Sequence, residues 1–409
     1  MTKHARTHRR TRLRAVSLAA VGVLAFGAAG AAAVYLELQS NIGEVDLTGM
    51  VGDEGARPEV TEPPPGDARA GAPVNLLIIG SDDRSGENAT IGGVEEGMQS
   101  DTTIVAHVAA DRSRVELVSL PRDLLADRPS CTMSDGSTTP ARENRQLNEA
   151  FRIGWDHGQD LASAAACTWK TVELLTGVRL DGLVLVDFVG LRDMVDAIGG
   201  VPICLPTDLD DDEYTGLHVK AGAQVFNGTT AVQFARARHN IGDGSDTGRI
   251  GRQQDLMAAM VRSVLSRDVL TSPTALFRFA QAATGSLTAS TGFRDLTDLT
   301  GFGLSLRGVQ ADRIVFVSMP TVASTRQKFR VESTAESAQL WARIAADQPV
   351  GEAPAAADPP PAADPPPTGD SPPAGDTPPA DPAAPPPVVE SPWSPPGGVL
   401  TSADDSSTC

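Results

Sequence analysis

Positive charge is scarce in this sequence and is concentrated at the N-terminus. The 409 residues contain 34 Lys and Arg against 52 Asp and Glu, which gives a net charge of −18. Six of the cations and no acid lie in residues 1–14, so the remainder carries a net charge of −24. Because nucleic-acid binding needs clustered surplus cations, this composition argues against a DNA- or RNA-binding protein.

Cysteine is also rare. The four cysteines lie far apart and form no Cys-x-x-Cys pair, at Cys131, Cys167, Cys204 and Cys409. This spacing argues against a zinc or iron–sulfur site, whereas in an exported protein it would allow disulfide bonds. We predict a disulfide between Cys131, in a loop after a predicted strand, and Cys167, in a predicted helix.

Export is suggested by the first 36 residues. Residues 15–36 are 22 apolar or small residues without a charge and follow the basic segment of residues 1–14. This length predicts a transmembrane helix, and the positive-inside tendency predicts a cytoplasmic N-terminus with the rest of the chain outside the cell membrane. A cleaved signal peptide is the alternative, because residues 28–33 are small enough for a signal peptidase.

Two further segments lack the large apolar residues that a core needs. Residues 37–72, with the run Thr-Glu-Pro-Pro-Pro-Gly at 61–66, are predicted to form an extracytoplasmic stalk. Residues 348–409 are predicted to be a disordered tail, since residues 351–409 hold 18 prolines, nine acids and no Lys or Arg. One folded domain is then predicted, over residues 73–347.

Within this domain, short apolar runs alternate with amphipathic stretches. The predicted strands are 74–80, 102–108, 115–120, 183–188, 201–205 and 314–318. The predicted helices are 161–175, 191–198, 249–265, 273–284 and 335–346. The alternation predicts an α/β fold in which helices cover both faces of a central sheet.

Four polar clusters lie at the ends of these elements, where open α/β sheets place their sites. They are Gly-Ser-Asp-Asp-Arg at 80–84, Ser-Asp-Thr at 100–102, Ser-Leu-Pro-Arg-Asp at 119–123, and Arg-Ala-Arg-His at 236–239 with residues 245–253. Any one of them alone is explained by solvated surface charge. Together, several arginines and aspartates without a His or Cys nucleophile are typical of phosphoryl transfer, which depends on charge neutralisation and alignment.

The fourth cluster predicts an anion site. Arg236 and Arg238 flank one alanine, and Arg249, Arg252 and Gln253 share the first turn of a predicted helix. Guanidinium groups at a helix N-terminus suit phosphate by charge and by bidentate geometry.

Two carboxylates from the first two clusters predict a metal site. Asp82 and Asp101 follow or open neighbouring predicted strands. They suit Mg²⁺, which prefers one or two carboxylates together with phosphate oxygens and water.

In this order the clusters resemble the LytR-CpsA-Psr family. The matching motifs are GSDDR, SDT, SLPRD, TVELLTG at 171–177, IGGVP at 198–202, ARARH and SDTGRIGRQQ. The resemblance implies a membrane-anchored enzyme with a central mixed β-sheet covered by helices on both faces. Such enzymes transfer a phosphate-linked glycopolymer, such as teichoic acid or arabinogalactan, from a polyprenyl-pyrophosphate carrier to peptidoglycan with Mg²⁺ or Mn²⁺.

The resemblance also implies roles for individual residues. Asp82 and Asp101 would hold the metal, and Asp246 would orient the arginines or accept the proton of the attacking sugar hydroxyl. The pyrophosphate would be bound by Arg84, Arg122, Arg236, Arg238, Arg249 and Gln253. Arg122 and Arg238 are also expected to act in catalysis with Asp246. Cys204 is expected to be unpaired, because Ala223 stands where relatives often carry a second cysteine.

The lipid part of such a carrier needs an apolar site. Candidate walls lie in residues 273–306, at Leu276, Phe277, Phe279, Phe293, Phe302 and Leu304. Ordinary core packing is the alternative for each of them.

Two other functions fit the same site. A hydrolase that cleaves lipid pyrophosphates would use the same Asp, Arg and metal groups with water as the acceptor. A non-catalytic wall-binding protein would keep the fold, but it would not need every arginine and aspartate of the motifs.

Overall fold

A mixed β-sheet forms the centre of the protein. The computed structural model describes residues 21–22, 25–52, 57, 71–82, 86–92, 98–238, 241, 246–266, 272–350 and 399–401. Eight strands lie in the order β1 (Gly43–Val45), β14 (Leu287–Ser290), β9 (Gly182–Val186), β2 (Val74–Ser81), β3 (Ser100–Val108), β4 (Val115–Leu120), β15 (Ile314–Ser318) and β18 (Val399–Thr401). Parallel and antiparallel pairs both occur, since β2 runs parallel to β9 and antiparallel to β3.

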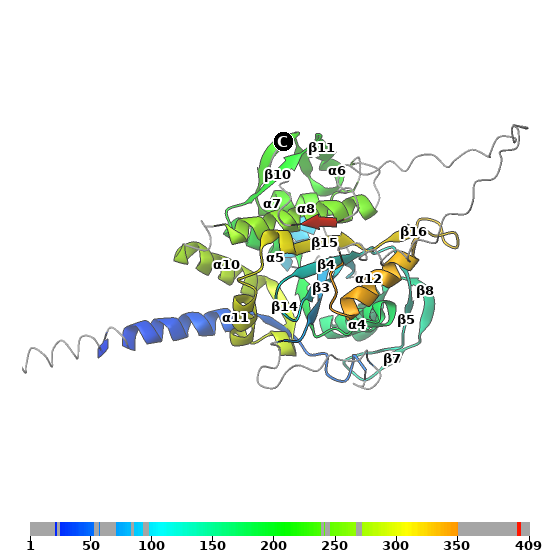
Figure 1. Cartoon of the computed structure of the whole chain (residues 1–409), viewed down its shortest axis with the longest axis horizontal. Coiled ribbons are helices and arrows are strands. Elements are labelled where there is room, and N and C mark those ends of the chain that lie inside the picture. Colours follow the sequence, from blue (N-terminus) through cyan, green and yellow to red (C-terminus); the bar gives the residue numbers. More distant parts are fainter. Residues whose placement is uncertain are drawn as a thin grey trace, which may run out of the picture.

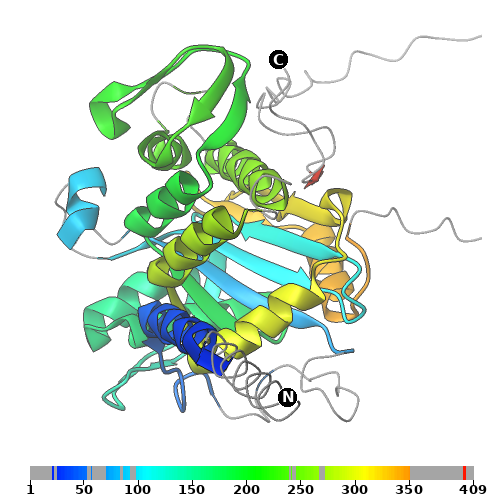
Figure 2. The same cartoon turned by 90° about the vertical axis from the view of Figure 1, so that its left-hand side faces the viewer.

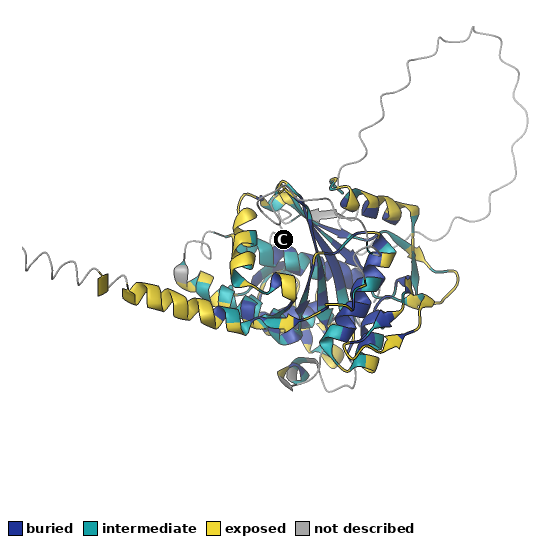
Figure 3. Ribbon diagram, turned by 90° about the horizontal axis from the view of Figure 1, so that it is seen from below, coloured by how far each residue is buried: buried dark blue, intermediate teal, exposed yellow. Residues whose placement is uncertain are grey.

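Helices cover both faces of this sheet (Figure 1). One face carries α3 (Glu149–Gly158), α4 (Leu161–Thr176) and α12 (Ala335–Ala345), and Trp169 and Trp341 pack there against Leu77. The other face carries α5 (Phe188–Ala197), α8 (Asp246–Leu265), α10 (Pro273–Ser286) and α11 (Leu296–Ser305). Figure 2 shows the strands between the two helical layers, and Figure 3 shows that the strands are the most buried part. The predicted fold class is therefore confirmed.

Smaller elements surround the central sheet. Five two-stranded units are β5 (Leu125–Arg128) with β8 (Arg142–Gln146), β6 (Cys131–Thr132) with β7 (Thr138–Thr139), β10 (Val201–Leu205) with β13 (Gly222–Phe226), β11 (Leu209–Asp211) with β12 (Leu217–Val219), and β16 (Thr321–Ala323) with β17 (Val331–Ser333). Short helices include α2 (Ala89–Gly92), α6 (Asp212–Thr215) and α7 (Gly228–Arg236). The predicted strand at 201–205 therefore exists, but it belongs to a separate hairpin.

One predicted boundary was wrong for an identifiable reason. The strand expected at 183–188 ends at Val186, and Phe188 begins α5 instead. Asp187 caps this helix, because its side chain accepts a hydrogen bond from the backbone N–H of Gly190 at 2.7 Å. An Asp at an N-cap satisfies a helix donor that would otherwise lack a partner, so the change from strand to helix occurs at this residue.

The segment predicted as a stalk is partly folded. Residues 25–41 are helical, and Tyr35 hydrogen-bonds to Thr297 of α11 at 3.2 Å. β1 then pairs in parallel with β14 at the edge of the sheet, and Ile42, Val45 and Met50 are buried. Residues 37–50 thus belong to the domain, because their spaced apolar side chains are buried at the edge of the sheet.

The predicted transmembrane helix at 15–36 falls partly on residues 1–20 and 23–24, outside the described residues. Within the described ranges, no helix is both long and apolar enough to span a bilayer.

The predicted disulfide is present. Cys131 and Cys167 are bonded, with their Cα atoms 5.1 Å apart. Cys204 is also disulfide-bonded, so the expectation that it is unpaired was wrong. Ala223 does lie opposite Cys204 in the β10–β13 hairpin, and the bond of Cys204 is therefore made elsewhere. Cys409 lies outside the described residues.

The C-terminal tail is not wholly detached from the fold. Residues 351–398 and 402–409 lie outside the described residues, but β18 between them pairs antiparallel with β15. The expectation that nothing in this tail packs was therefore wrong for residues 399–401. The sequence Val-Leu-Thr of β18 is too short a signal to be recognised within a proline-rich segment.

Replacing both Cys131 and Cys167 with alanine should lower the free energy of unfolding by about 3–4 kcal/mol. The bond closes a loop over a sequence separation of 36 residues, and such a cross-link restricts the unfolded chain. Urea denaturation of the variant and of the wild type measures the difference. A loss below about 1 kcal/mol would contradict this account.

Ending the chain at residue 350 should lower the melting temperature by a few degrees, because β15 loses its outer partner and the chain also loses Cys409. A matched variant that shortens residues 352–395 but keeps β18 should melt like the wild type. Equal melting temperatures for both variants would mean that β18 contributes no stability.

Candidate active site

Three distant segments meet at the carboxylate of Asp101. Asp101 lies at the start of β3, beside the end of the antiparallel strand β4 that precedes Arg122. Arg122 donates from Nη1 to Asp101 Oδ1 at 2.6 Å. Arg249 of α8 donates from Nη2 to the backbone oxygen of Asp101 at 3.0 Å, and its Nη1 lies 3.6 Å from Oδ1.

A second carboxylate, that of Asp246, completes a ring of alternating charges. Asp246 Oδ1 accepts from Arg249 Nη2 at 2.5 Å and lies 3.6 Å from Arg122 Nε. Its Oδ2 accepts from the backbone N–H of Arg122 at 3.1 Å. We call Asp101, Arg122, Asp246 and Arg249 the ion-pair quartet. Each of its charges touches two of the opposite sign.

The two carboxylates of the quartet differ in acidity. Burial raises the pKa of Asp101, but Arg249 and Arg122 outweigh burial and leave this pKa below its usual value. Burial also raises the pKa of Asp246, and there Arg249 and Arg122 offset it only in part. Asp246 is therefore the more basic carboxylate and the better proton acceptor.

Arg236 adds a further positive charge beside the quartet. It ends α7, its guanidinium lies 4.6 Å from the centre of the Phe188 ring, and it donates to the carbonyl of Ile91 at 2.9 Å. Its charge also lowers the pKa of Asp101, after burial and the larger effects of Arg249 and Arg122.

Two residues of α8, Arg252 and Gln253, hold the end of α7 that carries Arg236. Gln253 donates to the carbonyl of Ala235 at 3.1 Å, and Arg252 donates to the carbonyl of Ala237. The last carbonyls of a helix need such partners. Arg252, which the sequence placed with the anion-binding turn, is 2% exposed and supports the backbone instead.

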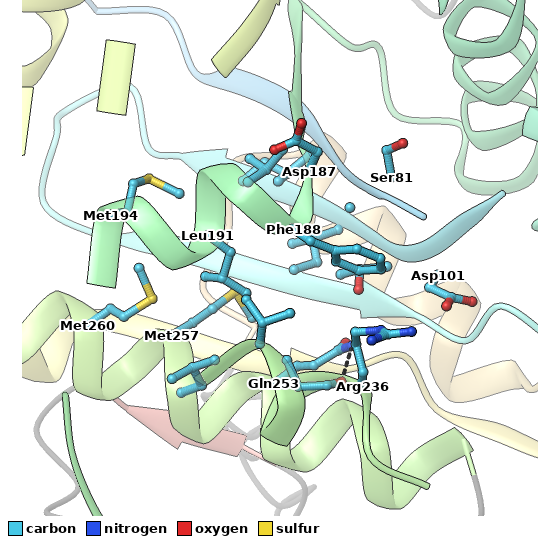
Figure 4. Close-up of a pocket in the computed structure, with 18 of the residues that line it drawn as sticks. Ser81, Asp101, Asp187, Phe188, Leu191, Met194, Arg236, Gln253, Met257 and Met260 are labelled. Carbon is cyan, nitrogen blue, oxygen red and sulfur yellow. Dashed lines mark hydrogen bonds between the residues drawn. The ribbon is translucent and has the colours of Figure 1, made fainter. Parts of the chain in front are cut away.

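A cavity with about 930 Å³ of empty volume opens beside these charges. Its polar residues are Ser81, Asp101, Thr102, Asp187, Arg236, Arg249 and Gln253. Its apolar residues include Phe188, Leu191, Met194, Val232, Met257 and Met260. Figure 4 shows Met194 and Met260 at one end of the cavity, and Asp101 and Arg236 at the other. The cavity therefore has one charged end and one apolar end.

The apolar walls are not those predicted. None of the six candidates in residues 273–306 lines this cavity. Phe293 and Phe302 pack edge to face in the core, with ring centres 6.4 Å apart, while Leu276 and Leu304 are exposed. The walls come instead from α5, α7 and α8, because these helices pack over the carboxyl ends of β2 and β9. The spacing of Met257 and Met260, three residues apart in the predicted helix at 249–265, is the sequence signal that could have pointed to one of these walls.

The structure brings most of the predicted site residues together. Asp101, Arg236, Arg249 and Gln253 line one end of the cavity, and Arg122 and Asp246 bind Asp101 and Arg249 there. Arg238 does not join them among the described contacts, since it is absent from the cavity lining and its backbone N–H donates to Asp211 Oδ2 at 3.2 Å. Arg84 lies outside the described residues.

Asp82 and Asp101 leave adjoining strands, as a shared metal would require. Ser81 pairs with Ser100 across β2 and β3, and the buried Oγ atoms of both lack a hydrogen-bond partner among the residues that the structure describes. Within the described ranges, no three or more His, Cys, Asp or Glu side chains converge as a metal cage. The carboxylate oxygens of Asp82 and Asp101 and the two serine hydroxyl oxygens fit Mg²⁺ that takes its remaining ligands from phosphate and water.

Known proteins resemble this chain in sequence and in fold. Cell wall biosynthesis protein LcpA of Corynebacterium glutamicum is 30% identical over 274 residues, which cover 63% of this chain and 52% of that protein. Polyisoprenyl-teichoic acid–peptidoglycan teichoic acid transferase TagU of Enterococcus faecalis is 30% identical over 194 residues, 47% of this chain and 54% of that protein. The chain thus spans about half the length of these relatives.

A solved structure, the LytR-Csp2A-Psr enzyme from Actinomyces oris, superposes with a TM-score of 0.50 at 21% identity, over 74% of this chain and 96% of that one. It shows that the fold is shared. Residues 48–344 match the model of the LytR_cpsA_psr family. Since this match covers most of the chain, with six of the eight described strands of the central sheet and the whole ion-pair quartet, the chain belongs to the LytR_cpsA_psr family.

Proposed function

We propose that this protein transfers a phosphate-linked glycopolymer from a polyprenyl-pyrophosphate carrier to peptidoglycan. The observation that carries the proposal is a cluster of arginines at the charged end of an otherwise apolar cavity. A polyprenyl pyrophosphate has the same two parts. The names of relatives as polyisoprenyl-teichoic acid–peptidoglycan transferases support this class of donor and acceptor.

Each part of the cavity has a role in this proposal. Leu191, Met194 and Met260 would contact the lipid chain, and the flexible methionines suit a chain without fixed shape. Arg122, Arg236 and Arg249 would bind the pyrophosphate. Because the quartet and Phe188 already fix these guanidinium groups, little side-chain entropy remains to be lost on binding.

In the proposed reaction, an acceptor hydroxyl oxygen forms a bond to the phosphorus that carries the polymer. The bond from this phosphorus to the bridging oxygen breaks, and the lipid leaves as polyprenyl phosphate. Asp246 accepts the hydroxyl proton, because it is the more basic carboxylate of the quartet. Arg236 and Arg249 stabilise the negative charge that is redistributed over the phosphate oxygens.

We also propose a divalent metal, Mg²⁺ or Mn²⁺, held by Asp82 and Asp101. It would supply charge neutralisation at the phosphates. In addition, residues 1–36 support attachment to the cell membrane with the catalytic domain outside.

The test uses the full chain with a radiolabelled polyprenyl-pyrophosphate glycopolymer, with and without peptidoglycan. Label should appear in peptidoglycan as lipid phosphate is released. Release without any transfer would favour the hydrolase, and no turnover of the donor under either condition would contradict the proposed function.

Replacing Arg236 with alanine should reduce kcat for transfer by about 10²-fold or more, as loss of an electrostatic donor to a transition state typically does. Arg236→Lys should restore little of this activity, because an ammonium group does not reproduce the bidentate contact of a guanidinium group. The melting temperature should change little, since Arg236 is only half-buried. Arg294→Ala, which removes an exposed ion pair with Glu44, is the control and should keep full activity. Wild-type turnover by Arg236→Ala would exclude the assigned role.

The pH dependence of kcat should report Asp246. As the pH falls, Asp246 gains its proton before Asp101, because the pKa of Asp246 is raised and that of Asp101 is lowered. The acid limb should therefore lie above the usual Asp pKa of about 3.9, and Asp246→Asn should remove most activity. Asp156→Asn, at an exposed helical ion pair, serves as the control. An acid limb at or below the usual Asp value would rule out Asp246 as the base.

A further inference from the structure

We infer that the loop between β16 and β17, residues 324–330, is an acceptor subsite that binds a glycan strand carrying carboxylates. The inference rests on the proposed function and specifies where its acceptor lies. We call these seven residues, Ser-Thr-Arg-Gln-Lys-Phe-Arg, the basic loop.

The basic loop is attached directly to the strand end that carries Arg122. Arg330 Nη1 lies 3.3 Å from Asp123 Oδ1, and the backbone N–H of Val331 donates to the carbonyl of Asp123 at 3.3 Å. Asp123 follows Arg122, whose guanidinium binds Asp101. A ligand on this loop therefore lies next to the ion-pair quartet.

The charge of the basic loop is opposite to that of the chain as a whole. The loop holds three cations and no acid, in a protein with a net charge of −18. Arg326 pairs with Glu332, and Arg330 pairs with Asp123. Lys328 has no carboxylate within ion-pair distance among the described residues, and its Nζ lies 4.7 Å from the centre of the Phe329 ring. The loop thus presents one unneutralised cation beside one aromatic ring.

Phe329 is exposed in a way that folding does not explain. Its side chain is 79% exposed and its φ is 61°, a left-handed conformation that a bulky residue rarely adopts. An exposed aromatic ring in a strained backbone contributes nothing to the core. Such strain, where it is observed, is concentrated at binding and catalytic sites.

The loop is nevertheless held in one conformation. Arg326 Nη1 donates to Asn144 Oδ1 at 2.5 Å, and Gln327 Nε2 donates to the Asn144 carbonyl at 3.0 Å. Within the loop, Ser324 Oγ accepts from the backbone N–H groups of Arg326 and Gln327, both at 3.0 Å. The ring and the ammonium group are therefore presented by a braced loop, which reduces the entropy lost on binding.

The position of the loop suits the acceptor. Phosphoryl transfer places the attacking and leaving oxygens roughly in line on opposite sides of phosphorus. The leaving lipid phosphate points toward the apolar end of the cavity, where Met194 and Met260 lie (Figure 4). The attacking hydroxyl must then approach from the other side, toward Asp123 and the basic loop.

The chemistry of the loop suits a carboxylated glycan. An exposed aromatic ring can stack on the apolar face of a sugar, and Lys328 can pair with a carboxylate such as those of the stem peptide. The anionic polymer of the donor offers similar charge, so the experiment separates acceptor from donor.

The experiment compares the full-length wild type with Phe329→Ala and Lys328→Ala in the transfer assay. We expect each variant to raise the KM for peptidoglycan about tenfold, without changing the KM for the donor or the release of lipid phosphate to water. Phe329→Tyr should restore the acceptor KM, because it keeps the ring. Val225→Ala, which alters an apolar side chain that is 71% exposed, is the control. An unchanged acceptor KM overturns the inference, and so does a donor KM that rises instead.

A second measurement separates this inference from the proposed function and from simple misfolding. Binding of soluble peptidoglycan fragments to the full chain is measured by calorimetry without any donor. Phe329→Gly should lose most of this binding and still melt at or above the wild-type temperature, because glycine relieves the left-handed strain. If transfer fails but this loss is seen, only the proposed function falls. If the glycine variant binds like the wild type, the acceptor subsite is wrong.

Discussion

The ion-pair quartet is the interaction on which the rest of the site depends. Arg122 and Arg249 come from segments far apart in sequence, and the side chain of Arg249 is 2% exposed. Two cations this close are unfavourable alone, and taking charges out of water is costly. Asp101 and Asp246 offset both effects by alternating with the arginines in one ring. The ring thereby holds the arginines together and oriented before any phosphate binds.

This constraint connects the polar site with the apolar cavity. Asp246 begins α8, so the ring fixes the start of this helix against the ends of β3 and β4. The same helix carries Met257 and Met260 about three and four turns later on the cavity side, and Gln253 supports the end of α7. One helix therefore sets the position of the charges, the apolar cavity and Arg236. A ligand with a charged head and an apolar chain is the kind of molecule that such an arrangement selects.

The sequence predicted the central elements and the charged residues well, because both have local signals. Apolar runs marked β2, β3 and β4, and the motifs at their ends identified Asp101 and Arg122. What it did not predict depends on long-range packing. Arg252 lies one turn after Arg249, yet its guanidinium donates to the carbonyl of Ala237 at the end of α7. The sequence pattern did not predict that helix. The basic loop was not predicted from the sequence either, because its position beside the site depends on its contact with Asp123, which is distant in sequence.

The most direct test of the account compares ligands that differ in one part only. Calorimetry of the full chain would measure the affinity for inorganic pyrophosphate, for a polyprenyl pyrophosphate, and for the polyprenyl alcohol of the same length. The account predicts that the lipid pyrophosphate binds far more tightly than either of the other two, because the arginines and the apolar cavity each contribute. Equal affinity for the alcohol and the pyrophosphate would contradict the role assigned to the ion-pair quartet and Arg236.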